Sequence, residues 1–216
     1  MIKENITKIL KELPDGVKLV AATKQRSVDE IKEALAGGLK IVGENYIQEA
    51  KPKFSVLGKA LTWHFIGHLQ KNKVRAAVKI FDMIETLDSY ELAEVIDKEC
   101  KRINKVMPVL IEVNSASETQ KSGVLPEKVQ ELLNDIRKCK NLKPMGLMTM
   151  GPFLDDAEKT RPFFRDSKVL FDKIKKDYSG DDWVYLSMGM SDSYKVAIEE
   201  GANIVRIGTK IFGQRD

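Results

Sequence analysis

The chain has 216 residues, of which 31% are charged and 43% apolar. This is the composition of an ordinary globular protein, and it excludes a disordered tail, a collagen-like fibre and a disulfide-rich miniprotein. Its 36 basic and 32 acidic residues leave a net charge of +4, too small an excess to indicate nucleic-acid binding by itself. No apolar run approaches the roughly 18 residues of a membrane-spanning helix. We therefore expect a single domain over residues 1–216, with no nucleic-acid partner and no membrane.

The first segment predicts an amphipathic helix that packs ahead of the main fold. Its apolar residues recur at helical spacing and are Ile2, Ile6, Ile9, Leu10 and Leu13. Glu4 and Glu12 interrupt the segment, whereas a secretory signal needs an unbroken apolar core and transit peptides avoid acidic residues. The two cysteines, Cys100 and Cys139, fall in helix-like segments. They are expected to be reduced core thiols of a cytoplasmic protein.

Eight short β-rich runs follow, with amphipathic helical segments between them. They are Lys18–Thr23, Lys40–Gly43, Trp63–Gly67, Met83–Thr86, Val106–Val113, Met145–Met150, Val184–Met188 and Ile204–Gly208. Nearly continuous apolar strands that alternate with helices indicate a parallel sheet covered on its faces. Eight such units predict an α/β fold, a (β/α)8 barrel of the TIM type with an extra N-terminal helix. The alternative is an open doubly wound sheet, which usually has a glycine-rich turn after its first strand; here that turn reads ATKQRS.

Three helix starts carry recognisable signals. Ser27 and Glu30 have the spacing of a capping box, and Asp88 and Glu91 are expected to play the same parts. Pro126 suits the first turn of another helix.

The carboxyl ends of the strands are where a barrel collects its active site. Lys24 follows the apolar run LVAAT, so its side chain begins at the barrel mouth. A desolvated lysine loses its proton more readily and becomes a nucleophile towards aldehydes. The alternative is an ordinary solvated lysine.

The loops after the seventh and eighth strands predict an anion site. Barrels often bind phosphate there, and the candidate groups are Ser187, Gly189, Ser191, Gly208 and Thr209. Ser191 is expected to cap a helix that begins near Asp192, and backbone amides around Gly208 complete the anion nest. The alternative is that the glycines only permit tight turns and the serines only cap. Both loops together, beside Lys24, favour a phosphate ligand that bears an aldehyde.

Arg206 interrupts the apolar run NIVRIG. A charge inside a barrel strand is costly unless it is paired. Arg206 is expected either to pair with an acid such as Glu112 or to donate a hydrogen bond to a ligand nitrogen, and the sequence leaves both open.

The histidines and methionines near the strand ends give weaker signals. His64 and His68 are four residues apart without a zinc-binding helix motif, so we expect His64 to line the core or a ligand ring and His68 to lie in the next loop. Met148 and Met150 are expected to pack the barrel, with one of them against a flat ring as the alternative. No ring of acids indicates a metal.

Several long motifs resemble one known family. They are AATK at 21–24, VGENYIQEA at 42–50, WHFIGHLQKNK at 63–73, GLMTM at 146–150, LSMGMSDSY at 186–194 and VRIGTKIFG at 205–213. They resemble the pyridoxal phosphate homeostasis proteins, also called the PLP-binding or alanine racemase N-terminal-like family, over nearly the whole chain. The resemblance implies a fold type III barrel, like the cofactor domain of alanine racemase, that holds pyridoxal 5′-phosphate (PLP) as an internal aldimine.

The resemblance also implies roles for individual residues. Lys24 would form the Schiff base, Asn45 and His64 would lie near the ring, and Arg206 would face the pyridine nitrogen. The phosphate would be held by Ser187, Ser191, Gly208 and Thr209. The remaining cofactor-binding residues would be Met148 and Gly189. Lys121, in TQKSG, matches a lysine that could serve as a secondary attachment or transfer site.

One departure from the family pattern follows Lys24. Gln25, Arg26 and Ser27 stand where the family has Thr-Lys or Thr-Gln and then proline. A second functional lysine directly beside Lys24 is therefore not expected.

The predicted function is that of a carrier. An arginine opposite the pyridine nitrogen keeps that nitrogen unprotonated, which weakens the ring as an electron sink. Racemases of this type add a tyrosine base from a separate β-domain, for which this chain has no residues after its eighth strand; Tyr46 and Tyr194 remain candidates in the mouth loops. We therefore expect a monomer that binds PLP and passes it to PLP-requiring apoenzymes. The alternatives are a low-specificity racemase or lyase completed by a partner chain, and a barrel that binds another phosphorylated anion.

Overall fold

Eight parallel strands close into a barrel in the order β1 to β8. The computed structural model describes residues 1–116, 122–152, 154–177 and 182–214. The strands are β1 Lys18–Ala22, β2 Ile41–Glu44, β3 Thr62–Phe65, β4 Met83–Leu87, β5 Met107–Val113, β6 Leu142–Thr149, β7 Tyr185–Ser187 and β8 Ile204–Ile207. Closure comes from pairing of β1 with β8, in which Ala21 lies opposite Ile207. The barrel predicted from the sequence is confirmed, and the open doubly wound sheet is excluded.

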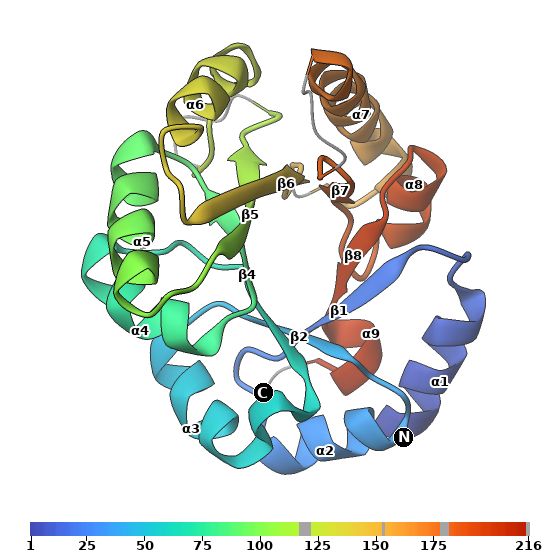
Figure 1. Ribbon diagram of the computed structural model, residues 1–216. Coiled ribbons are helices and arrows are strands. Elements are labelled where there is room, and N and C mark those ends of the chain that lie inside the picture. The colour runs from blue at the N-terminus through green and yellow to red at the C-terminus, as the bar shows by residue number, and fades with distance from the viewer. Residues whose placement is uncertain (117–121, 153, 178–181, 215–216) are drawn as a thin grey trace.

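Helices form a ring outside the strands, as the view along the barrel in Figure 1 shows. They are α1 Ile2–Glu12, α2 Val28–Ala36, α3 Ile47–Leu57, α4 Val74–Ile80, α5 Tyr90–Arg102, α6 Val129–Ile136, α7 Arg161–Asp177, α8 Tyr194–Glu199 and α9 Thr209–Phe212. The extra helix α1 packs beside α2 and α9, where the Asn5 side chain donates to the Ile211 carbonyl at 3.0 Å. No helix in the described part of the chain is long and apolar enough to cross a membrane.

The predicted helix starts are partly correct. Ser27 and Glu30 form the capping box, with the Ser27 hydroxyl accepting from the Glu30 amide at 3.2 Å and the Glu30 carboxylate from the Ser27 amide at 2.7 Å. The box expected at Asp88 is wrong, because α5 begins one residue later and its N-cap Ser89 donates its hydroxyl to Asp88. Pro126 opens a short 3₁₀ turn directly before α6.

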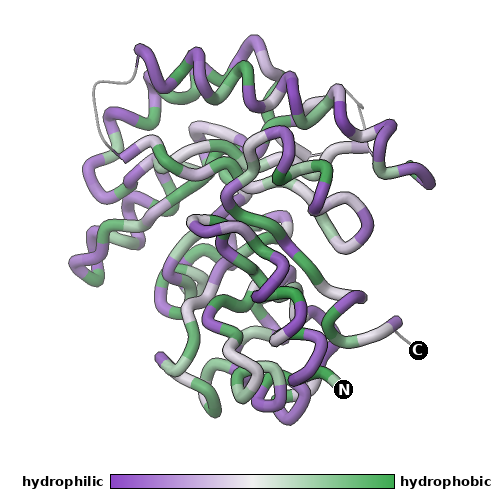
Figure 2. Tube along the Cα trace, turned by 90° about the vertical axis from the view of Figure 1, so that its right-hand side faces the viewer, coloured by the Kyte–Doolittle hydropathy of each residue, from purple (hydrophilic) through white to green (hydrophobic). Residues whose placement is uncertain are grey.

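The core has two layers. Most buried apolar side chains fill the space between the strands and the helices, and Figure 2 shows these helices alternating between green and purple, as amphipathic helices do. A smaller cluster fills the inside of the barrel and comprises Val20, Ile66, Met83, Leu110, Met148 and Ile204. Both cysteines are buried and free. The barrel interior also holds charged residues, and these define the site.

Candidate functional site

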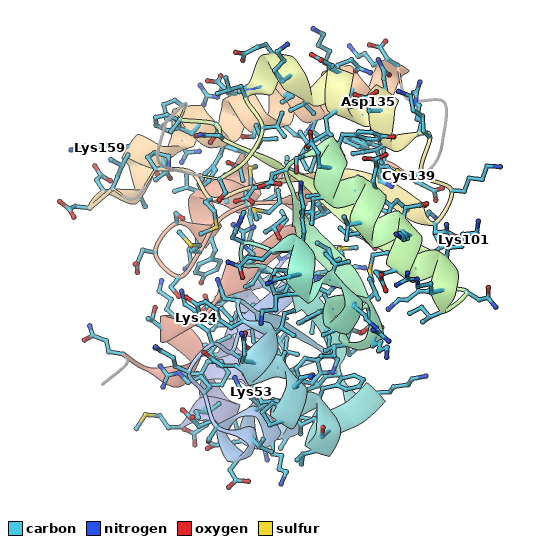
Figure 3. The ribbon with its side chains drawn as sticks, turned by 90° about the vertical axis from the view of Figure 1, so that its left-hand side faces the viewer. Lys24, Lys53, Lys101, Asp135, Cys139 and Lys159 are labelled. Carbon is cyan, nitrogen blue, oxygen red and sulfur yellow. The ribbon has the colours of Figure 1, made fainter. Side chains whose placement is uncertain are left out.

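Lys24 lies in the turn directly after β1, and its side chain is partly buried. In Figure 3 it lies at the same end of the barrel as Lys159, which follows β6, and at the opposite end from Lys101 at the end of α5. This is the end where the strands finish and where barrels place their chemistry. The next residue, Gln25, has a φ of 61°, so the turn bends sharply after Lys24.

A cavity of about 310 Å³ opens beside Lys24. Six of the ten predicted site residues line it, namely Lys24, Asn45, Ser191, Arg206, Gly208 and Thr209. Apolar side chains form much of the remaining wall, including Ile66, Met150, Pro152 and Leu154. An apolar cavity with a few convergent polar groups is the usual form of a small-molecule site.

Arg206 ends a buried chain of polar groups inside the barrel. Its guanidinium donates to the Ser187 hydroxyl at 2.6 Å and to the Thr149 carbonyl at 2.8 Å. Ser187 in turn donates to Glu85 at 2.6 Å, and the other oxygen of Glu85 lies 2.6 Å from His64 Nδ1. Burial lowers the pKa of Arg206. For Glu85, burial acts to raise the pKa, but His64, Arg206 and Ser187 together hold it below its usual value.

This chain of contacts bears on one of the two alternatives for Arg206, pairing with an acid; the hydrogen bond to a ligand nitrogen remains a prediction. Arg206 bonds Ser187 and reaches Glu85 through that hydroxyl, and no ion pair with Glu112 is present among the described residues. Ser187 is fully buried and, like His64, does not line the Lys24 cavity. Their assignment to the phosphate and to the ring remains a prediction.

The turns after β7 and β8 meet through Ser191. Its hydroxyl accepts from the Gly208 amide at 3.2 Å and from the Lys210 amide at 3.5 Å. Ser191 does not cap the next helix as expected, because α8 begins at Tyr194 and its N-cap is Ser193. The Ser191 oxygen thus occupies the position where amides at the start of α9 converge.

Gly189 and Met148 have structural surroundings outside the cavity lining. Gly189 has a φ of 89°, and a Cβ there would lie 2.5 Å from the Ala197 Cβ, so only glycine lets this turn approach α8. Its carbonyl accepts from the Arg206 amide at 3.0 Å, which fixes the turn against β8. Met148 is fully buried within the cluster inside the barrel. Their cofactor contacts remain predictions.

Sequence reasoning did not single out two buried charged residues, Lys53 and Glu85. Glu85 interrupts the apolar run of β4 just as Arg206 interrupts β8, so the same signal would have found it. Lys53 lies on α3 among other helical lysines and gave no signal. Lys121 lies outside the described residues. No cluster of potential metal ligands occurs among the residues that the structure describes.

Comparison with known proteins places this arrangement in a family. A family model described as alanine racemase, N-terminal domain, matches residues 1–216. Proteins named pyridoxal phosphate homeostasis protein are similar along most of their length: that of Aquifex aeolicus is 44% identical, over 92% of this chain and 87% of its own, and that of Helicobacter pylori strain 26695 is 40% identical, over 91% and 87%. The chain belongs to the family of pyridoxal phosphate homeostasis proteins. The human protein of that name is 38% identical, over 92% of this chain and 77% of its own.

Solved structures have the same fold as this member of the pyridoxal phosphate homeostasis proteins. PipY of Synechococcus elongatus, solved without PLP, superposes with a TM-score of 0.92 at 32% identity, covering 99% of this chain and 100% of its own. The same protein with PLP bound gives 0.90 at 31% identity, with the same coverage. Alanine racemase of Clostridium difficile gives 0.83 at 17% identity, covering 99% of this chain and 56% of its own. At that identity the likeness shows the fold alone.

Proposed function

We propose that this protein binds PLP in the Lys24 cavity and acts in PLP homeostasis as a carrier of the cofactor. The observation that carries the proposal is that Lys24, Arg206, Ser191 and Gly208, from opposite ends of the sequence, line one cavity. The names of its relatives and the PLP-bound structure of PipY support the same ligand.

The residues present fit this cofactor at its aldehyde end and at its ring. When bound, the cofactor supplies an aldehyde that condenses reversibly with amines and a conjugated ring that withdraws electrons. The Lys24 amine would attach at the aldehyde carbon with loss of water. Arg206 presents only hydrogen-bond donors, so it would pair with a ring nitrogen that accepts. Its contacts to Ser187 and Thr149 hold the guanidinium in place for that.

The phosphate group of the cofactor fits the place near Ser191 where two backbone amides converge. The Gly208 and Lys210 amides already point at one oxygen atom, the Ser191 hydroxyl. A phosphate oxygen near Ser191, Gly208 and Thr209 would receive the same kind of donation, strengthened because the acceptor is charged. The donors therefore need little rearrangement to bind an anion.

A carrier is favoured over a racemase by the positions of the two candidate tyrosines. Tyr194 donates its hydroxyl to Glu12 of α1 at 3.1 Å, and burial together with this contact raises its pKa to about 12. Tyr46 is 56% exposed and lines a different surface depression. Neither lines the Lys24 cavity, so neither is placed as a second base beside it. A monomeric state, a cytoplasmic location and transfer to PLP-requiring apoenzymes complete the proposal.

The experiment is reductive trapping. The purified protein is incubated with PLP, reduced with borohydride and mapped by peptide mass spectrometry. We expect the pyridoxyl adduct on Lys24 and loss of the bound-cofactor absorbance in Lys24→Ala, because no other amine is placed at this cavity in the described structure. An unmodified Lys24 in the treated wild type would contradict the proposal. Robust, Lys24-dependent turnover of D- or L-amino acids would replace the carrier with the racemase.

A further inference from the structure

The residue before Lys24 is held by β2 and α3. The Thr23 amide donates to the Gly43 carbonyl at 2.9 Å, and its hydroxyl donates to Glu44 at 2.6 Å. The Thr23 carbonyl accepts from the ammonium of Lys53 at 2.7 Å. Thr23 is fully buried, so these contacts leave little freedom on the amino-terminal side of Lys24.

The residue after Lys24 is held by the same helix. The Gln25 amide donates to the Glu49 carboxylate at 2.6 Å, and Gln25 has a positive φ of 61°. A non-glycine residue in this region of backbone space is strained and persists only when its surroundings hold it. Glu49 therefore restrains the carboxyl-terminal side of Lys24.

Lys53 joins these two restraints. Its ammonium lies 2.7 Å from Glu44 and 3.5 Å from the same Glu49 oxygen that receives the Gln25 amide. Lys53 is 7% exposed and Glu44 is completely buried. Burial raises the pKa of Glu44 even though Lys53 opposes the shift. One buried cation thus balances both carboxylates and bonds the main chain next to Lys24; Figure 3 shows Lys53 close to Lys24 in that view.

We propose that Lys53 is a positioning residue that fixes the turn carrying Lys24, so that its amine is presented to the cavity. Lys53 does not line the cavity, so it acts on the cofactor only through the main chain of Thr23 and Gln25. The inference rests on the proposed function, in which Lys24 is the point of attachment. A flexible turn would present the amine only part of the time, and the apparent affinity for PLP would fall by that fraction.

The test compares three variants of the full-length protein. Lys53→Met removes the cation but leaves Glu44 buried without it, which is a strongly destabilising change. Lys53→Met/Glu44→Gln removes both charges and keeps an oxygen for the Thr23 hydroxyl, and it serves if the single variant does not fold. Lys51→Met is the matched control, because Lys51 is an exposed lysine on the same helix.

Two measurements are made on each folded variant. Hydrogen exchange of the cofactor-free protein reports the protection of the Gln25 amide, and absorbance titration reports PLP affinity. We expect the double variant to lose Gln25 protection and to bind PLP roughly tenfold more weakly, with Lys51→Met unchanged in both. Adduct mapping should still find Lys24 as the modified residue.

A folded double variant with wild-type affinity and wild-type Gln25 protection would overturn the inference. So would weaker binding with Gln25 protection unchanged, because the effect would then not pass through the turn. If the wild type itself takes up no cofactor at Lys24, the proposed function fails. Exchange at Gln25 then decides alone whether Lys53 holds the turn.

Discussion

Glu112 is a buried carboxyl inside the barrel, and one of its oxygens has no hydrogen-bond partner among the residues that the structure describes. It lies on β5 and is 7% exposed. Burial raises its pKa to about 7, the charge of Asp88 adds to the rise, and Arg206 opposes it. The folded protein therefore holds a proton at Glu112 that the unfolded chain has already lost near pH 5 to 6.

This predicts a pH-dependent gain of stability in Glu112→Gln. Glu112 binds its proton more tightly in the folded protein than in the unfolded chain. The free energy of unfolding of the wild type therefore falls as pH rises from about 4.5 to about 7, and this loss is complete above pH 7. A shift of this size corresponds to at most about 3 kcal/mol. In urea denaturation at pH 5, 6, 7 and 8, the free energy of unfolding of Glu112→Gln relative to the wild type should increase with pH and then level off. Glu127→Gln, at an exposed position, is the control; an advantage of Glu112→Gln that does not vary with pH would contradict the assignment.

Sequence reasoning found the residues that break a local pattern. Lys24 follows an apolar strand and Arg206 interrupts one, and both line the cavity. The contacts between His64, Glu85 and Ser187 could not be predicted from local sequence patterns, because they join three different strands, β3, β4 and β7. Such partners follow only from the register of neighbouring strands, which local patterns do not encode.

At the scale of elements, β6 depends on a glycine at its contact with β7. Gly146 has a φ of 148°, and a Cβ there would lie 1.8 Å from the Tyr185 carbonyl oxygen. The pairing of β5 with β6 shifts register in the same region, between Val109 and Ile111. The close approach thus belongs to an irregularity that lets β6 continue around the barrel.

We expect Gly146→Ala to destabilise the protein strongly. The added methyl group meets fixed backbone, and the backbone conformation also disfavours alanine, so the cost should be roughly 3 kcal/mol or more. Gly16→Ala separates the two effects, because Gly16 also has a positive φ of 85° but no atom within 4 Å of its Cβ; it should cost about 1 kcal/mol. Thermal denaturation checks both, and equal losses in the two variants would show that the close contact at Gly146 contributes nothing.

The start of a helix could be predicted from the sequence where the residues that mark it lie within one helical turn. Ser27 and Glu30 marked a helix start correctly because both partners lie within one turn. The start expected at Asp88 was off by one residue because Ser89, its neighbour, is equally able to occupy the N-cap. Ser191 carried a capping signal but bonds the amides after β8 instead, a contact that depends on how β7 and β8 pack.

For the whole molecule, closure of the barrel joins the first strand to the last. β1 pairs with β8 from Lys18 opposite Ile204 to Ala21 opposite Ile207. The count of eight strand–helix units predicted this closure, but it could not give the register. Without β8, both β1 and β7 would expose unpaired edges, and the cluster inside the barrel would lose Ile204.

A chain truncated after Asn203 should therefore lose cooperative folding. It lacks β8 and α9, so the exposed edges and core favour aggregation over a native state. Truncation after Gly213 is the matched control, because it keeps all eight strands and α9. Circular dichroism melting distinguishes them: a sharp transition is expected only for the longer chain, and a sharp transition in the shorter one would show that the barrel is stable while open.

The cavity is lined by residues from both ends of the sequence, so its two sides are synthesised at different times. Lys24 is translated about 180 residues before Arg206, roughly 10 to 35 s earlier at ordinary elongation rates. During that interval the nascent chain carries Lys24 without Arg206, Gly208 and Thr209, which line the same cavity in the folded protein. Under the proposed function, the complete cavity is available to PLP only after β8 has been synthesised and the barrel has closed.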